Sequence, residues 1–237
     1  MKKAKAILAC ILLFATILGG CGMEKENSNN EIYTREEVQQ QMFTYLEEKY
    51  GEKFVEISTA YKTYGRNWEE MEVYPKGKSK DESFMVYRMT RENGEVYYTD
   101  RYVISCKQEE YKKYIESLIK PYLKEFRCRV FIKSYKTQEN DLLPSISFSE
   151  FKGYVDKELY VNIQVLFLMD KEHLDKSAID AKISDLNNQI KQNVSEGNLF
   201  VYGFNDEYYK KNVLDRDEKY YDYENNTCEF REHWVRK

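Results

Sequence analysis

The fold class is indicated by residues 84–100, which read FMVYRMTRENGEVYYTD. Asn93-Gly94 is typical of a type I′ turn, because both central residues of that turn need a positive φ. The turn lies between two segments rich in the aromatic and β-branched residues that favour strands. The sequence therefore predicts strands over 84–91 and 95–104, paired antiparallel.

A helix is predicted ahead of these strands. Thr34 and Glu37 have the spacing of a capping box, and Tyr33 and Val38 are placed as its hydrophobic staple. Gly51 stands where a left-handed C-cap would end the helix. One face of this helix is apolar and carries Val38, Met42, Phe43, Leu46 and Tyr50.

The rest of the chain continues as alternating strands and helices. Apolar spacing predicts a helix over 107–125, with Pro121 kinking or ending it near Ile119. Ser177 and Asp180 are read as caps of a later helix that ends near Gly197. Strands are expected at 53–61, 70–75, 128–135, 159–169 and 199–204.

These elements predict an α+β fold with helices packed on a mainly antiparallel sheet. We expect an α+β domain over 34–135, a loop over 136–158, a β-α-β part over 159–204 and a charged, tyrosine-rich tail over 205–237. The two parts are expected to form two small subdomains. A helix followed by four strands resembles cystatin-like and NTF2-like folds, an analogy of fold that implies no activity.

The first twenty residues are typical of an export signal. Lys2, Lys3 and Lys5 precede an uncharged apolar run from Ala6 to Leu18. That run is shorter than the roughly 20 residues that a membrane-spanning helix needs, so it fits a cleaved signal peptide better than a permanent span.

The signal leads directly into Leu18-Gly19-Gly20-Cys21. This stretch resembles the lipobox of bacterial lipoproteins, with Gly at position 19 in place of the more usual Ala or Ser. The resemblance implies that Cys21 receives a diacylglyceryl group and that cleavage falls between Gly20 and Cys21. The alternative is an ordinary secretory signal with an accidental cysteine.

A polar segment follows, so residues 21–33 are predicted to be a lipidated cysteine and a flexible tether. Ten extended residues span roughly 35 Å. The chain has a net charge of −4. Loss of the three signal lysines would leave 34 basic against 41 acidic residues, a net charge of −7. Such a charge, without a long basic block, argues against nucleic acid as a partner.

No catalytic or metal-binding motif is found in the sequence, and no cofactor is expected. Cys106, Cys128 and Cys228 remain after the signal and the lipid site, and they form either no disulfide or one that involves Cys228. His173, three residues after Asp170, and His233 lack the spacing of zinc sites and are interpreted as surface residues.

Tyrosine is unusually frequent, with 22 among 237 residues. Tyrosine is enriched at interfaces, and it also fills half-buried strands. Tyr97-Tyr98 lie in a predicted strand, where packing is the simpler explanation. The tail residues are the speculative binding cluster: Tyr208, Tyr209, Tyr220, Tyr221, Tyr223 and Trp234.

The leading functional hypothesis is a non-enzymatic, lipid-anchored protein on the outer face of the cytoplasmic membrane that binds a protein or cell-wall polymer. A lipobox followed by an α+β body rich in Lys, Glu and Tyr resembles uncharacterised lipoproteins of low-GC Gram-positive bacteria. This resemblance rests on the first 21 residues and on composition, and it implies no functional residue beyond Cys21. A carboxylate-dependent envelope hydrolase is the alternative. A solute-binding component of an uptake system is the second alternative.

Overall fold

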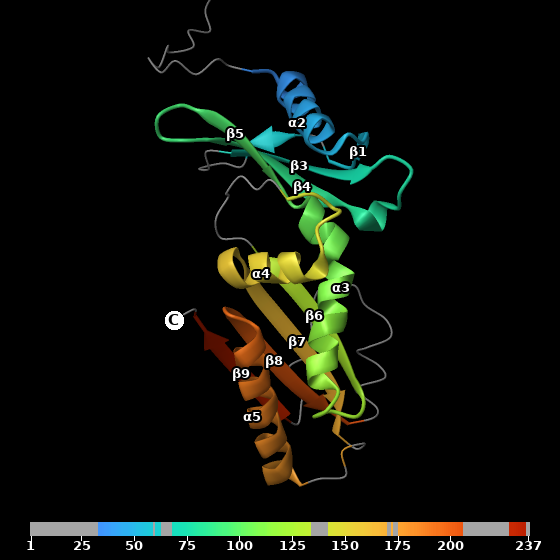
Figure 1. Ribbon diagram of the computed structural model, residues 1–237, viewed down its shortest axis with the longest axis vertical. Coiled ribbons are helices and arrows are strands. Elements are labelled where there is room, and N and C mark those ends of the chain that lie inside the picture. The colour runs from blue at the N-terminus through green and yellow to red at the C-terminus, as the bar shows by residue number, and fades with distance from the viewer. Residues whose placement is uncertain are drawn as a thin grey trace, which may run out of the picture. The chain divides into compact units, whose positions relative to one another are not determined.

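The computed structural model describes residues 33–58, 60–62, 68–133, 142–169, 172, 175–205 and 228–235. It has an α+β fold with two separate β-sheets (Figure 1). The predicted fold class is therefore confirmed.

The first sheet is antiparallel and has the order β1-β3-β4-β5, with β2 also paired to β3. Its strands are β1 (Phe54–Glu56), β2 (Tyr61–Lys62), β3 (Trp68–Pro75), β4 (Phe84–Thr90) and β5 (Val96–Asp100), with the short helix η1 (Lys80–Glu82) between β3 and β4.

The β4–β5 pairing is confirmed, and the turn between the two strands differs from the prediction. The Arg91 N–H donates to Glu95 O at 2.9 Å, and the Gly94 N–H donates to Arg91 O at 2.9 Å. The hairpin thus has a three-residue loop, in which Gly94 takes the positive φ of 86° that such loops require.

Helix α2 (Arg35–Tyr50) packs on one face of the first sheet, and the predicted capping box is present. The Glu37 N–H donates to Thr34 Oγ1 at 3.2 Å, and Gly51 closes the helix with a φ of 70°. The core between α2 and the sheet consists of Val38, Met42, Leu46, Phe54, Ala60, Met71, Val73, Phe84, Val86 and Tyr102.

Helix α3 (Tyr102–Ile119) begins five residues before the predicted range of 107–125 and ends at Ile119, near which Pro121 is expected to kink or end the helix. It starts early because Asp100 Oδ1 accepts the Tyr102 N–H at 2.8 Å. This bond satisfies one of the N–H groups that a helix start leaves unpaired. Residues 102–104 are therefore helical and do not continue the strand.

The second sheet has the order β6-β7-β8-β9. Its strands are β6 (Phe126–Lys133), β7 (Tyr160–Leu168), β8 (Gly197–Phe204) and β9 (Cys228–Trp234). β7 and β8 are parallel and are connected through α5 (Lys176–Asn193), whereas the other two pairs are antiparallel.

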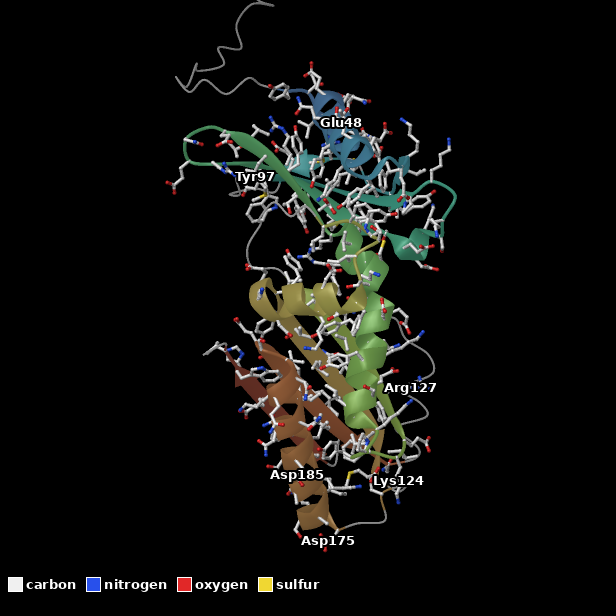
Figure 2. All side chains as sticks on the ribbon, in the orientation of Figure 1. Glu48, Tyr97, Lys124, Arg127, Asp175 and Asp185 are labelled. Atoms are coloured by element: carbon white, nitrogen blue, oxygen red, sulfur yellow. The ribbon has the colours of Figure 1, made fainter. Side chains whose placement is uncertain are left out.

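Three features of this sheet differ from the prediction. β6 pairs with β7 and so belongs to the second sheet, although the predicted first domain extended to residue 135. The predicted loop 136–158 contains α4 (Phe148–Glu158), and the predicted tail contains β9. Asp175, not Ser177 or Asp180, caps α5, since its side chain accepts the Ala178 N–H at 2.9 Å (Figure 2 labels Asp175).

Helices α3, α4 and α5 cover one face of the second sheet (Figure 1), and the larger hydrophobic core lies between them and the strands. Side chains of a strand alternate between the two faces of a sheet. Val161, Ile163, Val165 and Phe167 of β7 enter this core, as predicted for one face of a central strand.

Candidate functional site

The predicted lipid-attachment site and most of the predicted binding cluster lie outside the described residues. These are Gly20, Cys21, Tyr208, Tyr209, Tyr220, Tyr221 and Tyr223. Trp234 is described, and it is only 7% exposed. Its indole Nε1 donates to Val194 O at 2.8 Å within the core under α5. Trp234 therefore packs inside the protein and does not contribute an exposed binding surface.

Tyr97 and Tyr98 point to opposite faces of the first sheet, because they are consecutive in β5. The Tyr98 hydroxyl donates to Gln41 Oε1 of α2 at 3.0 Å, whereas the Arg91 guanidinium carbon lies 4.8 Å from the centroid of the Tyr97 ring. The two neighbouring tyrosines do not form one aromatic cluster.

Cys106 and Cys128 are both free thiols. Burial raises the pKa of Cys128 to about 12, and burial also raises the pKa of Cys106. Both side chains are therefore protonated at neutral pH and are poor nucleophiles. Cys128 in β6 lies three strands from β9, about 14 Å, which is too far for a disulfide with Cys228.

Of the two histidines, only His233 lies among the described residues. His173, like Asp170, lies outside the described residues. His233 is exposed in β9, and its Nδ1 lies 2.8 Å from Asn198 Oδ1 and 3.2 Å from the Tyr160 hydroxyl. Within the described part of the chain, no three His, Cys, Asp or Glu side chains converge as metal ligands would.

The most buried carboxylate of the first sheet is that of Asp100, whose side chain is 1% exposed. Its Oδ2 accepts the Tyr45 hydroxyl at 2.7 Å and Lys49 Nζ at 2.9 Å. Its Oδ1 accepts the Tyr50 hydroxyl at 2.7 Å and the Tyr102 N–H. Four donors thus hold one carboxylate, which joins the end of β5 to α2 and to the start of α3.

The environment of this cluster also changes the pKa of Tyr50. Burial, followed by the nearby Asp100 charge and the hydrogen bond to it, raises the pKa of Tyr50. The phenol therefore stays protonated and donates to the carboxylate. Because both oxygens of Asp100 already accept two hydrogen bonds each, the cluster is best explained as a structural link.

A second buried polar network holds the N-terminal half of α2 to the sheet. Arg88 is 6% exposed; its Nε donates to Gln41 Oε1 at 3.0 Å, and its NH1 lies 3.2 Å from Glu69 Oε2. Its guanidinium also lies 4.8 Å from the centroid of the Tyr33 ring, an arrangement typical of a cation–π contact. This contact holds Tyr33, the first described residue, against β4.

A second buried carboxylate, that of Glu172, lies in the turn between β7 and α5, and its side chain is 0% exposed. Its Oε1 accepts the Lys124 N–H at 2.8 Å, and its Oε2 lies 2.6 Å from Lys182 Nζ (Figure 2 labels Lys124). A buried charge of this kind needs such partners. Glu172 therefore joins the turn before β6 to α5.

The face of the second sheet opposite α3, α4 and α5 is different in character. The strand registers place its side chains in cross-strand rows. We call this surface the basic face and define it as Arg127, Arg129, Phe131, Lys133, Asn162, Gln164, Asn198, Phe200, Arg231 and His233. At another part of the same face, Leu166, Leu168, Tyr202 and Phe204 form a separate buried cluster.

The first row of the basic face is Phe131–Asn162–Asn198–His233. Asn198 Nδ2 donates to Asn162 Oδ1 at 2.9 Å, and the Asn198 oxygen lies 2.8 Å from His233 Nδ1. Phe131 is 39% exposed at the end of the row. The row combines polar side chains held by one another with an exposed aromatic ring.

The second row is Arg129–Gln164–Phe200–Arg231. Arg127 and Lys133 lie on the same face of β6, at the edge of the sheet (Figure 2 labels Arg127). Four of these ten side chains are permanent cations, namely Arg127, Arg129, Lys133 and Arg231. The three arginines also interact within the chain, and a guanidinium with five N–H donors still can bind a further acceptor.

The sequence interpretation did not identify this face, although part of the signal is present. Residues 126–133 read FRCRVFIK, in which Arg127, Arg129, Phe131 and Lys133 alternate with residues of the core. The alternation indicates a strand with one basic side. The contribution of Arg231 and His233 depends on the pairing of β9, which no local pattern reveals.

None of the helices in the described ranges is long and apolar enough to span a bilayer. Comparison of the chain with models of protein families, with curated proteins and with solved structures finds no match.

Proposed function

We propose that this chain is a lipid-anchored, non-enzymatic binding protein on the outer face of the cytoplasmic membrane. The observation that carries the proposal is Leu18-Gly19-Gly20-Cys21, placed directly after a lysine-rich start and a short apolar run. Acyl chains on Cys21 would hold the body at the membrane, since two or more chains give stable anchoring.

A binding role is supported by the use that the body makes of its ionisable groups. The buried carboxylates of Asp100 and Glu172 are each engaged with two or more donors. Cys106 and Cys128 have raised pKa values. These groups stabilise the fold, whereas the basic face presents exposed charged and aromatic side chains beside half-buried amides, a combination suited to contact with a partner.

Two cysteines in the N-terminal segment allow a matched test of the anchor. Cys21→Ala removes the proposed acylation site, and Cys10→Ala changes a cysteine eleven residues earlier in the apolar run. After growth with radiolabelled palmitate, we expect label in the unmodified chain and in Cys10→Ala, both in the membrane pellet, and none in Cys21→Ala. Equal labelling and sedimentation of Cys21→Ala would refute the proposal.

A further inference from the structure

We propose that the segment 206–227 of this chain packs on the face of the second sheet that α3, α4 and α5 leave uncovered. Its docking surface is the outer cluster, which we define as Leu166, Leu168, Tyr202 and Phe204. The inference goes beyond the proposed function and does not depend on the lipid anchor. It gives the tail tyrosines a role in the fold instead of in binding a partner; these are Tyr208, Tyr209, Tyr220, Tyr221 and Tyr223.

The outer cluster is buried although α3, α4 and α5 cover the opposite face of the sheet. Each of its four side chains is at most 3% exposed. Farther along the same face, the side chains of Asn162, Gln164 and Asn198 are only half-buried. Among the other hydrophobic side chains of the described residues, only Phe200 packs against the cluster. One ring cannot bury four large side chains to this extent, so we infer that another part of the chain covers them.

The connection between β8 and β9 is the segment best placed to do so. β8 ends at Phe204, a member of the cluster, and β9 begins at Cys228, which pairs with Gly203. The chain therefore enters and leaves the segment on neighbouring strands, about 5 Å apart, beside the cluster. A segment of 22 residues tethered at both ends acts at an effective concentration on the order of millimolar, which favours it over a free partner.

Two other segments outside the described residues are less suitable. Residues 134–141 follow Lys133 at the opposite end of the sheet and continue into Leu142, which packs against the core under the helices. The short stretch 170–174 follows Met169, which packs against the same core. Both segments are thus joined to residues on the helical side of the sheet, away from the outer cluster.

The composition of the segment suits this surface. Seven of its 22 residues can cover an apolar cluster, namely Tyr208, Tyr209, Val213, Leu214, Tyr220, Tyr221 and Tyr223. The segment also has seven acidic and four basic residues. Arg127 lies in the same row as Leu166, and Arg129 and Arg231 lie in the next row. These three arginines and Tyr202 each interact within the chain, as we expect if an acidic, tyrosine-rich segment lies over them.

Limited trypsin digestion of the full chain, extracted from cells in a non-ionic detergent, tests the inference. The segment contains four cleavage sites, at Lys210, Lys211, Arg216 and Lys219. We expect them to be cut at least tenfold more slowly than the exposed site at Lys78. Val213→Ser with Leu214→Ser should raise the rate in the segment at least tenfold and leave the rate at Lys78 unchanged. The control, Asn225→Ser with Asn226→Ser, should change the rate in the segment less than twofold.

Variants of the sheet test the other side of the contact. Leu168→Ala should also raise cleavage in the segment, whereas Phe131→Ala, at an exposed position on the same face, should not. If Leu168→Ala unfolds the chain, cleavage at Lys78 rises as well, and the Val213→Ser, Leu214→Ser variant, which leaves the strands unchanged, gives the answer.

Three results would overturn the inference. One is equal cleavage in the segment and at Lys78 in the unmodified chain, and another is an unchanged rate in the segment after Val213→Ser with Leu214→Ser. The third is protection that is lost on dilution, which would assign the outer cluster to a second copy of the chain. Slow cleavage that is independent of protein concentration, and that both the segment and the sheet variants relieve, would support it.

Discussion

Lys49 Nζ of α2 lies 2.9 Å from Asp100 Oδ2 at the end of β5, with the two side chains 13% and 1% exposed. The pair lies 51 positions apart in sequence and joins a helix to the sheet beneath it. Its environment is almost dry, so its contribution to stability differs from that of surface ion pairs.

Asp100→Ala should destabilise the protein by about 3–5 kcal/mol, since it leaves Lys49 buried without its counter-ion and removes the acceptor of four hydrogen bonds. Urea denaturation measures the change. Glu95→Ala breaks an exposed pair with Arg91 and should cost at most about 1 kcal/mol. Similar midpoints for the two variants would show that the buried pair contributes little.

Stability should fall as pH rises above about 10. Burial raises the pKa of Tyr50, Tyr102 and Tyr111, so the folded state keeps protons that the unfolded chain has lost. The folded state then binds more protons, and its stabilisation, complete below pH 10, decreases by at most about 1.4 kcal/mol per pH unit for each tyrosine.

Urea midpoints between pH 8 and 11 test this dependence. Tyr111→Phe should make the decline shallower, because it removes one of the three tyrosines. A midpoint that stays constant over this range would mean that the tyrosines ionise equally easily in both states.

Gly197→Ala should be strongly destabilising. A Cβ at this position would lie 2.2 Å from Val161 O and 3.2 Å from a ring carbon of Trp234, so β8 could not keep its place beside β7. Gly153→Ala in α4 is the control: no atom of the described residues lies within 4 Å of the added carbon, and alanine should stabilise the helix by about 0.5–1 kcal/mol. Melting temperatures that move in the same direction would contradict this packing.

Two tyrosines of α3 should respond to phenylalanine in opposite ways. The Tyr111 hydroxyl is buried and has no hydrogen-bond partner among the described residues, whereas the Tyr114 hydroxyl donates to Asn193 Oδ1 at 3.2 Å. Tyr111→Phe removes an unsatisfied group and should be neutral or stabilising; Tyr114→Phe should cost about 1 kcal/mol. Chemical denaturation checks both, and a large loss in Tyr111→Phe would reveal a partner for its hydroxyl.

The local part of the fold could be predicted because its signals lie close together in sequence. The capping box of Thr34 and Glu37 and the hairpin around Gly94 are formed within a few residues, and both are present. Ser147 and Glu150 form the same kind of box at the start of α4. The start of this helix could therefore also have been predicted, although the sequence analysis assigned residues 136–158 to a loop.

The non-local part could not be predicted in this way. β6 follows α3 in the chain but pairs with β7, which begins 27 residues after β6 ends. The residues next to β6 therefore do not show to which sheet it belongs. Trp234 lies in the predicted tail, and its position under α5 depends on the pairing of β9 with β8. The basic face needs three strand registers at once, and only its β6 part has a pattern visible in sequence.

The most direct test of the account is the mass of the N-terminal peptide of the chain isolated from cell membranes. We predict that it begins at Cys21 and carries the mass of a diacylglyceryl group on the thiol. A peptide that begins at another residue, or at Cys21 with a free thiol, would contradict the lipid anchor on which the proposed location depends.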